Sequence, residues 1–424
     1  LPPGLYTLTI YYNNQPFSRP NVLVQLGKEA VVNVTVDSAV AAGKAGPGEV
    51  IELSGSVPII DQGSTKTGFT VTDDYTRNIP TGRTFAGVLG SAAGSQADQF
   101  GVSLAGATSA ENVYVVEGIN TTDTGFGGVS TNLPNEFISE TESITGGYNA
   151  EFGRASGGIV NVVTKSGSDQ FRGSVFGYFT PGALTAGAKT IQREGNSIDT
   201  ATNLDYAYDV GAEIGGPIIP KKLWFHVGFN PSQAKTSVNR LVQRQIDTDQ
   251  DGVPDVDPNT GFTVRVRVTD SDLTQNLTTY FFTAKVNGAS NQNHQFQISA
   301  FGNPRSGDLA LATQVRNPDT GVIRREDGAY DVSGKWTSKF NDGKTQVDAV
   351  VGFHRGYRNS IAKNDVQEQA GMQFQFERSL FDFQSIERGD LSGCNDADPN
   401  DPYPNITNCP VVGYQSQGLG TLED

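Results

Sequence analysis

Residues 247–255 have the spacing of side chains that bind a hard cation. Asp247, Asp249 and Asp251 place carboxylates at alternate positions, followed by Gly252 and then Asp255. This spacing lets several oxygen ligands wrap around one ion, with a glycine for the sharp turn, and it predicts a structural Ca²⁺ site. The loop departs from an EF-hand because Pro258 stands where that loop has its bidentate Glu. The alternative interpretation is a solvated acidic turn.

The two cysteines predict a disulfide. Cys394 and Cys409 bracket a polar loop rich in Asn, Asp and Pro. A bond formed in an oxidising compartment explains this arrangement better than two free thiols.

No set of residues forms a recognisable catalytic constellation. His226, His294 and His354 lie on or beside expected strands and lack metal-ligand spacing, so we expect them to be polar residues facing a lumen. Neither cysteine has a nearby histidine, and no GxSxG elbow occurs. We therefore expect a protein that is not an enzyme. The formal net charge of −15 argues against a nucleic-acid partner, since a phosphate-binding surface should be basic.

The second half of the chain has the pattern of two-faced strands. From residue 168 onward, segments of about ten residues alternate apolar and polar side chains. In residues 206–214, for example, the even-numbered side chains are apolar or aromatic, whereas Asp209 and Glu213 fall on the other face. We expect the even-numbered face to meet lipid and the two carboxylates to point into a lumen.

The lengths of the connections favour a membrane barrel over a soluble sandwich. Tight connections at GGPIIPKK, NGASNQN and NDGK alternate with long ones, expected at about residues 181–202, 231–274, 304–327 and from 359 onward. This parity is typical of a barrel with periplasmic turns on one rim and extracellular loops on the other. Seven strands can be counted, so we expect the barrel to be incomplete and the sequence, which begins without Met, to be a fragment.

The first half divides into three parts by composition. Residues 1–37 alternate like the last strands of a small β-sandwich, and residues 38–54 are a linker of small residues that ends in a short extended run. Residues 55–167 are rich in glycine, and residues 168–424 hold the predicted barrel strands and loops. In the third part we expect glycines to supply positive φ and close backbone approach; these are Gly146, Gly147, Gly153, Gly157 and Gly158.

Three segments carry a resemblance to a known family. SLAGATSAENVYVVEGIN (103–120), GGYNAEFGRASGGIVNVVTKSG (146–167) and FRGSVFGYF (171–179) resemble the plug and first barrel strand of TonB-dependent outer-membrane transporters. The likeness extends to the Oar-like branch, whose members carry a carboxypeptidase-regulatory-like domain ahead of the plug. Glu117 stands where the family more often has Asp, and Ala105 precedes Gly106 where Arg is common.

The resemblance implies a fold dominated by β-structure. Its parts would be the end of a carboxypeptidase-regulatory-like β-sandwich, an α+β plug, and the first part of a transmembrane antiparallel β-barrel in contact with outer-membrane lipid. Arg154 and the five glycines become structural residues of the plug. Charged plug residues, including Glu151 and Arg154, should then meet inward-facing partners such as Asp209 and Glu213.

The resemblance also implies a function. The chain would act in the outer membrane of a Gram-negative bacterium as an energy-coupled transporter. The TonB protein would pair with an added strand, formed by Glu49, Val50, Ile51, Glu52 and Leu53. The large loops and the extra amino-terminal domain favour a bulky substrate such as a peptide, protein or other polymer. The alternative is a surface barrel whose calcium-braced loops act in adhesion or partner binding.

Overall fold

The computed structural model describes residues 4–12, 15–24, 51–52, 66–98, 101–148, 152–153, 155–187, 198–246, 248–249, 255–262, 264–291, 293–310, 321–341, 343–363, 373–374 and 414–415. Most of these residues lie in strands, and the principal sheets have three, five and eight strands. No helix among the described residues is long and apolar enough to cross a membrane.

The smallest of the three sheets is at the amino terminus. Strand β1 (Gly4–Tyr12) pairs antiparallel with β2 (Gln15–Val24), in agreement with the alternation seen in the sequence. The two-residue strand β3 (Ile51–Glu52) adds to β2 in parallel, with Ile51 opposite Phe17 and Glu52 opposite Ser18. Part of the segment predicted to meet TonB is therefore already paired as a strand.

The five-stranded sheet is the centre of a compact domain, residues 66–164, that we call the plug. Its strands are β4 (Thr67–Thr72), β7 (Val113–Val116), β8 (Ile119–Asn120), β9 (Ile138–Gly146) and β10 (Ile159–Thr164). Their order is β4-β9-β10-β7-β8, so β4 and β8 form opposite edges. Val160 and Val162 of the central strand β10 are buried in the plug core with Phe85, Leu104 and Leu133.

Short helical turns and one small hairpin complete the plug. They are α2 (Asp73–Asn78), α3 (Phe85–Val88), η1 (Leu89–Ser91), β5 (Gln96–Ala97), β6 (Val102–Ser103), η2 (Ser109–Glu111) and η3 (Asn135–Phe137). At η2, Thr108 and Glu111 form a capping box, which satisfies backbone donors at its start.

The plug glycines have different roles. Among those expected at positive φ, Gly147 has a φ of 66°, whereas the described Gly146, Gly153, Gly157 and Gly158 do not lie in this region. Close approach explains two of them instead. A Cβ on Gly157 would lie 2.5 Å from Asn112 Oδ1, and one on Gly158 would lie 2.5 Å from Leu104 Cδ1.

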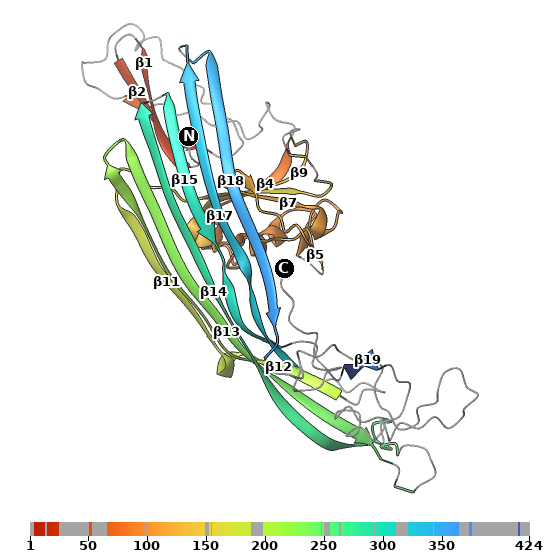
Figure 1. Ribbon diagram of the computed structural model, residues 1–424. Coiled ribbons are helices and arrows are strands. Elements are labelled where there is room, and N and C mark those ends of the chain that lie inside the picture. Colours follow the sequence, from red (N-terminus) through yellow and green to blue (C-terminus); the bar gives the residue numbers. More distant parts are fainter. Residues whose placement is uncertain are drawn as a thin grey trace.

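The eight-stranded antiparallel sheet, which we call the barrel wall, lies beside the plug (Figure 1). Its strands are β11 (Arg172–Pro181), β12 (Ile198–Ile219), β13 (Leu223–Gln245), β14 (Arg265–Asn291), β15 (His294–Gly302), β16 (Arg305–Ala310), β17 (Val322–Phe340) and β18 (Thr345–Ile361). Both β15 and β16 pair with β14 and with β17, so they are two parts of one wall strand. The wall thus has the seven strand positions expected from the sequence.

The strands are longer than predicted. More than half of the expected connection 231–274 is strand, because β13 continues to Gln245 and β14 begins at Arg265. The ends of 181–202 and 304–327 are also strand, since β12 begins at Ile198, β16 spans Arg305–Ala310 and β17 begins at Val322. Polar cross-strand pairs such as Asn239 and Asp272 hold these extensions together. A pattern built on apolar residues does not detect strands of this kind. The alternation of tight turns and long connections is confirmed.

The two faces of the wall differ as predicted. Val175 is 84% exposed and Val351 is 76% exposed on the outer face, whereas the described inward side chains of His226 and Lys285 are buried. On β12, Val210 and Ile214 are exposed, and Asp209 and Glu213 contact plug residues. The predicted lumen orientation of these two carboxylates is confirmed.

Exposed aromatic side chains form two bands on the outer face. One lies near the tight turns (Phe171, Phe296, Trp336 and Phe340), and the other lies further along the same strands (Phe179, Phe229, Tyr280 and Tyr330). Such bands mark the two interfaces of a membrane barrel. His294 packs against Phe340, with ring centroids 5.5 Å apart, so the prediction that all three histidines face the lumen is wrong for His294.

Beyond the second aromatic band, three strands continue away from the membrane. Strand β13 runs from Phe229 to Gln245 and β14 returns from Arg265 to Tyr280, a length along each strand of about 50 Å at the usual rise per residue. Figure 1 shows β12, β13 and β14 running on well past the level of the plug.

Candidate functional site at the interface of plug and barrel wall

Glu117 is the centre of the buried contact between the plug and the wall. It lies in the turn between β7 and β8, and its Oε1 accepts hydrogen bonds from Lys285 Nζ and from the Thr164 amide, both at 2.7 Å. Its Oε2 accepts from Gln297 Nε2 at 2.5 Å and lies 3.4 Å from Lys335 Nζ. We call these five residues the Glu117 cluster. One plug carboxylate thereby connects β14, β15 and β17.

The electrostatics of the cluster keep Glu117 ionised. The side chains of Glu117 and Lys285 are both fully buried, with 0% exposure. Burial by itself would raise the pKa of Glu117, but the nearby Lys285 and Lys335 together outweigh burial and lower it to about 2. Glu117 also has a φ of 51°. Gly118 follows with a φ of 78°, as the two-residue turn of the β7–β8 hairpin requires of both its central residues.

Glycines on the inner face of the wall make sockets for plug side chains. A Cβ on Gly352 would lie 2.1 Å from Ile119 Cγ2, and one on Gly228 would lie 2.6 Å from Phe137 Cε1. In the opposite direction, Phe301 of β15 is fully buried and belongs to the hydrophobic core of the plug. At these positions the side chains of the plug and the wall interdigitate.

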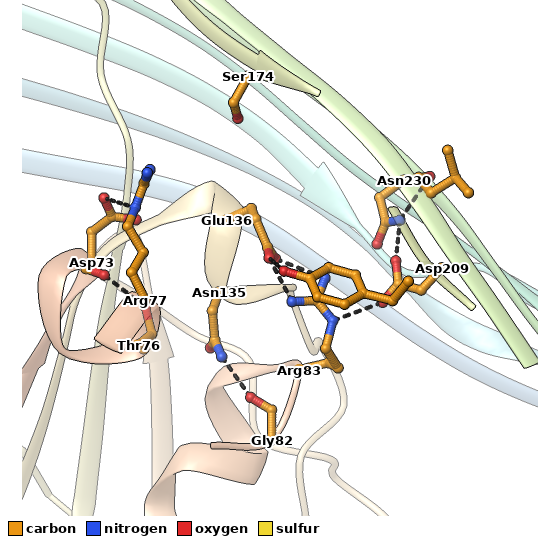
Figure 2. Close-up of polar contacts among 12 residues, drawn as sticks. Asp73, Thr76, Arg77, Gly82, Arg83, Asn135, Glu136, Ser174, Asp209 and Asn230 are labelled. Carbon is orange, nitrogen blue, oxygen red and sulfur yellow. Dashed lines mark hydrogen bonds and ion pairs between the residues drawn. The ribbon is translucent and has the colours of Figure 1, made fainter. Parts of the chain in front are cut away.

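A second set of contacts joins Arg83 of the plug to β11 and β12. Arg83 forms a bidentate pair with Glu136, at 2.5 and 3.1 Å, and its Nε lies 3.1 Å from Asp209 Oδ2. Its guanidinium carbon is 3.6 Å from the centre of the Tyr178 ring, a cation–π contact. Figure 2 shows Asp209 and Asn230 of the wall directed towards this arginine. Although burial opposes it, pairing with Glu136 and Asp209 raises the pKa of Arg83.

A third set, the Lys165 cluster, lies where the plug chain continues into β11. Lys165 Nζ is 2.7 Å from Glu213 Oε1 on β12 and 3.4 Å from Asp73 Oδ1 in α2. Glu213 also accepts a hydrogen bond from Ser174 at 3.0 Å and lies 3.3 Å from His226 Nε2. The carboxylates predicted to meet plug charges do so, and their partners are Arg83 and Lys165. Glu151 and Arg154, named as partners from the sequence, lie outside the described residues.

A cavity of about 490 Å³ lies between the plug loop around residues 123–130 and the wall, on the side of the long strands. Arg358 of β18 lies 4.7 Å from the centre of the Phe126 ring and 3.8 Å from Asp123 Oδ2. Charges of both signs and aromatic rings thus line this outer chamber.

The other residues predicted as sites are only partly described. Asp247 and Asp251 lie outside the described residues, and Asp255 accepts hydrogen bonds from the backbone and side chain of Thr248. Within the described ranges, no group of three or more acidic, histidine or cysteine side chains could hold a metal. Cys394 and Cys409 also lie outside them, as do Glu49, Val50 and Leu53. The calcium site and the disulfide stay predictions.

The alternation in the sequence puts Lys285, Gln297 and Lys335 on the polar face of their strands, but it does not identify Glu117 as their common partner. The signal for Glu117 was only an acidic residue before glycine at the end of an apolar strand. Arg83 had no local signal, because its partners Glu136 and Asp209 are 53 and 126 positions away.

A wall of long antiparallel strands with an apolar outer face, and a plug docked on its polar inner face, defines part of a plugged outer-membrane β-barrel. Sequence and fold comparisons agree. The chain is 32% identical over 458 residues to the TonB-dependent transporter Oar of Myxococcus xanthus, a match that covers 100% of this chain and 42% of that protein. The chain belongs to the TonB-dependent outer-membrane transporters, and its location is the outer membrane of a Gram-negative bacterium.

The fold comparison gives a second relative. The chain is similar to the crystal structure of the outer membrane transporter YddB from Escherichia coli, with a TM-score of 0.51 and 13% identity over 84% of this chain and 43% of that one. At this identity the likeness concerns the fold alone. No family model matches the chain.

Proposed function

We propose that the chain is part of an energy-coupled transporter in which TonB pulls on residues 49–53 and thereby rearranges the plug. The observation that carries this proposal is the polar character of the contact between the plug and the wall, at Glu117, Arg83 and Lys165. At Arg83 and Lys165, which are partly exposed, water can replace the hydrogen bonds when the contacts open, so each contributes a modest net free energy. The buried Glu117 pair is the stronger contact and sets the position to which the plug returns. A plug held in this way can be displaced and can return.

The coupling segment is able to pair as a strand, since Ile51 and Glu52 do so with β2. TonB would use the same backbone groups, which is the mode known as β-augmentation. The relatives named above are transporters, and this supports transport rather than catalysis.

A bulky substrate, such as a peptide, protein or other polymer, fits the outer part of the molecule. Strands β12, β13 and β14 extend about 50 Å beyond the outer aromatic band and can form the side of a tall vestibule. The chamber of about 490 Å³ at the plug lies on the same side.

The coupling step can be tested with Ile51→Pro in the full-length protein. Proline removes the backbone donor, so cross-linking of this segment to TonB in cells should be lost, while Ile51→Val should cross-link like the parent. Undiminished cross-linking of the proline variant would contradict the coupling role.

The size of the substrate can be tested separately. A full-length variant lacking residues 66–164 should form an open pore in planar bilayers, and polyethylene glycols of increasing mass should be scored for entry. Entry of polymers much larger than a metal chelate supports a bulky substrate. Exclusion of all but the smallest would oppose it.

A further inference from the structure

The lipid-facing side of the wall carries a groove of about 520 Å³ on β11, β12 and β13. Its lining combines two small residues with large, exposed apolar side chains: Gly173 and Ala212, then Val175, Ile214, Val227 and Phe229. Ser174 and Glu213 also border it, but these two side chains bond to each other on the inner side of the wall. Phe229 belongs to the outer aromatic band, so the groove begins at that band and lies among the acyl chains of the membrane.

Beyond the outer aromatic band, the same face of β12, β13 and β14 carries polar side chains that bond across the strands. Gln233 Nε2 donates to Asn276 Oδ1 at 2.8 Å, and Asn203 Nδ2 donates to Asn239 Oδ1 at 2.9 Å. We call these side chains the amide ladder: Gln233, Asn276 and Thr278 in its lower rung, and Asn203, Asn239 and Asp272 in its upper rung. On β13 the rungs follow Phe229 at even spacings, at about 14 Å and about 34 Å, so they share its face.

The wall changes polarity at the outer aromatic band. Below the band the outer face is apolar and the inner face is polar. Beyond it the inner face carries apolar residues, since Val238 is buried there opposite Leu273, and Leu277 follows on the same face of β14. The polar outer face of this part is unsuited to acyl chains. In the outer membrane of a Gram-negative bacterium, the layer just outside the acyl chains is the saccharide of the outer-leaflet lipid.

Two tyrosines lie between the groove and the ladder. Tyr206 and Tyr208 of β12 stack with their ring centroids 6.4 Å apart and their planes 10° apart. They are opposite Lys235 and Gln233, and the Tyr206 hydroxyl donates to Gln233 Oε1 at 3.4 Å. An aromatic ring with a polar tip is suited to the level where acyl chains meet a wet, polar layer. The tyrosine pair therefore joins the apolar groove to the lower rung.

We propose that the outer face of β11–β14 binds one molecule of the saccharide-bearing lipid of the outer leaflet, with an acyl chain in the groove and the saccharide along the amide ladder. The two parts are continuous, because β12 and β13 contribute to both. A side-chain amide has two donor hydrogens and an acceptor oxygen with two lone pairs. The bonds within the ladder therefore leave donors and acceptors for sugar hydroxyls, which can pair with either.

The charges near the ladder favour a sugar over a phosphate. Lys235 lies 3.5 Å from Asp205, so its charge is offset on the same face. Lipid tails are as apolar as the wall, and the groove gains only van der Waals packing with a chain that fits it. The exposed hydrogen bonds of the ladder exchange with water, so each contributes little. Together the two parts select a lipid with both an acyl chain and a saccharide over a phospholipid.

Two adjacent residues of β14 test which face meets the saccharide. Thr274 lies on the outer face opposite Ser237, and Leu273 lies on the inner face opposite Val238. A photo-cross-linking amino acid is placed at one position or the other in the full-length protein in cells. We expect a saccharide-bearing product at Thr274, none at Leu273, and loss of that product in cells whose lipid saccharide is truncated. Products at both positions, no product at Thr274, a product unchanged by truncation, or a protein as the main product would overturn the proposal.

The groove is tested by filling it. Ala212→Trp fills the groove and Ala212→Leu fills part of it, whereas Ala349→Trp on β18 puts the same ring on the exposed outer face, opposite Trp336 and away from the groove. Each full-length protein is purified in detergent and incubated with lipopolysaccharide or with its lipid A part, and the bound lipid is counted by native mass spectrometry.

The parent and Ala349→Trp should each retain one lipopolysaccharide and several-fold less lipid A. Retention of lipopolysaccharide should fall several-fold in Ala212→Trp and by less in Ala212→Leu. Equal retention by the parent and Ala212→Trp would show that the groove holds no acyl chain. Equal retention of lipopolysaccharide and lipid A by the parent would show that the ladder holds no saccharide. Either outcome would refute the proposal and leave the transport function unaffected.

Discussion

Glu117 of the plug and Lys285 of the wall form an ion pair at 2.7 Å although 168 positions separate them in the chain. Both side chains have 0% exposure. Two opposite charges removed from water in this way are stable only as a pair. Their contact therefore holds the plug against the wall in a single position, with Glu117 presented to the wall by the tight turn between β7 and β8.

Removing one partner of this pair should be strongly destabilising. Lys285→Met leaves the Glu117 carboxylate buried with the more distant Lys335, at a cost of about 3–5 kcal/mol. The double variant Glu117→Gln with Lys285→Met should recover part of that loss, because no uncompensated charge remains. Thermal unfolding of the purified full-length proteins measures both. If the double variant is no more stable than Lys285→Met alone, the two residues do not act as a pair.

The stabilisation from Glu117 should be constant with pH across the neutral range. Its folded pKa of about 2 lies below the ordinary carboxyl value of 4.5, so its contribution is present above 4.5 and is lost as pH falls towards about 2. The difference in melting temperature between the parent and the double variant Glu117→Gln with Lys285→Met, which leaves no unpaired buried charge, should thus be flat between about pH 5 and neutral pH and shrink below pH 5. Both proteins carry the same histidines, so the effect of histidine titration on the melting temperature is the same in each and cancels in the difference. A difference that shrinks already between neutral pH and 5 would contradict this assignment.

The wall at Gly228 should not tolerate a larger side chain, because the Phe137 ring of the plug packs against this position. Valine there would push into the Phe137 ring, whose nearest atom is 2.6 Å from the new Cβ, and we expect a cost of about 1–3 kcal/mol from overpacking. Gly334→Val is the control, since its Cβ meets nothing closer than Val351 O at 3.9 Å. Protease sensitivity of the plug in the folded protein should increase for the first variant only. Equal sensitivity of the two variants would show that Phe137 does not occupy the socket.

The acidic loop should make stability depend on calcium. Chelation should lower the melting temperature of the full-length protein, and Asp251→Asn should remove that response. Asp396→Asn is the control, because Asp396, Asp398 and Asp401 form a second acidic stretch of the sequence without a turn glycine, and this variant should keep the response. Adding calcium back at about millimolar concentration or below, the range of extracellular sites, should restore the melting temperature of the parent protein. A melting temperature indifferent to calcium would leave residues 247–255 as a solvated acidic turn.

The local features of this fold could be predicted from sequence, and the long-range pairings could not. Alternation fixed the facing of Asp209 and Glu213 because a one-residue slip would have moved both to lipid. The outer parts of β13 and β14 could not be predicted in this way, since polar residues occupy both faces there and the apolar–polar alternation is lost. The partners of Arg83 and Glu117 come from distant strands, and nothing in the neighbouring residues specifies them.

A disulfide trap tests the docking of the plug inside the wall most directly. The Cβ of Ile119 lies 3.0 Å from the position of a Cβ on Gly352, close enough for a bridge after small adjustment. Ile119→Cys with Gly352→Cys, in the full-length protein in the outer membrane, should form a disulfide between the plug and β18, detected by mass spectrometry of an unreduced digest. Two free thiols in a correctly folded, membrane-inserted protein would contradict the account.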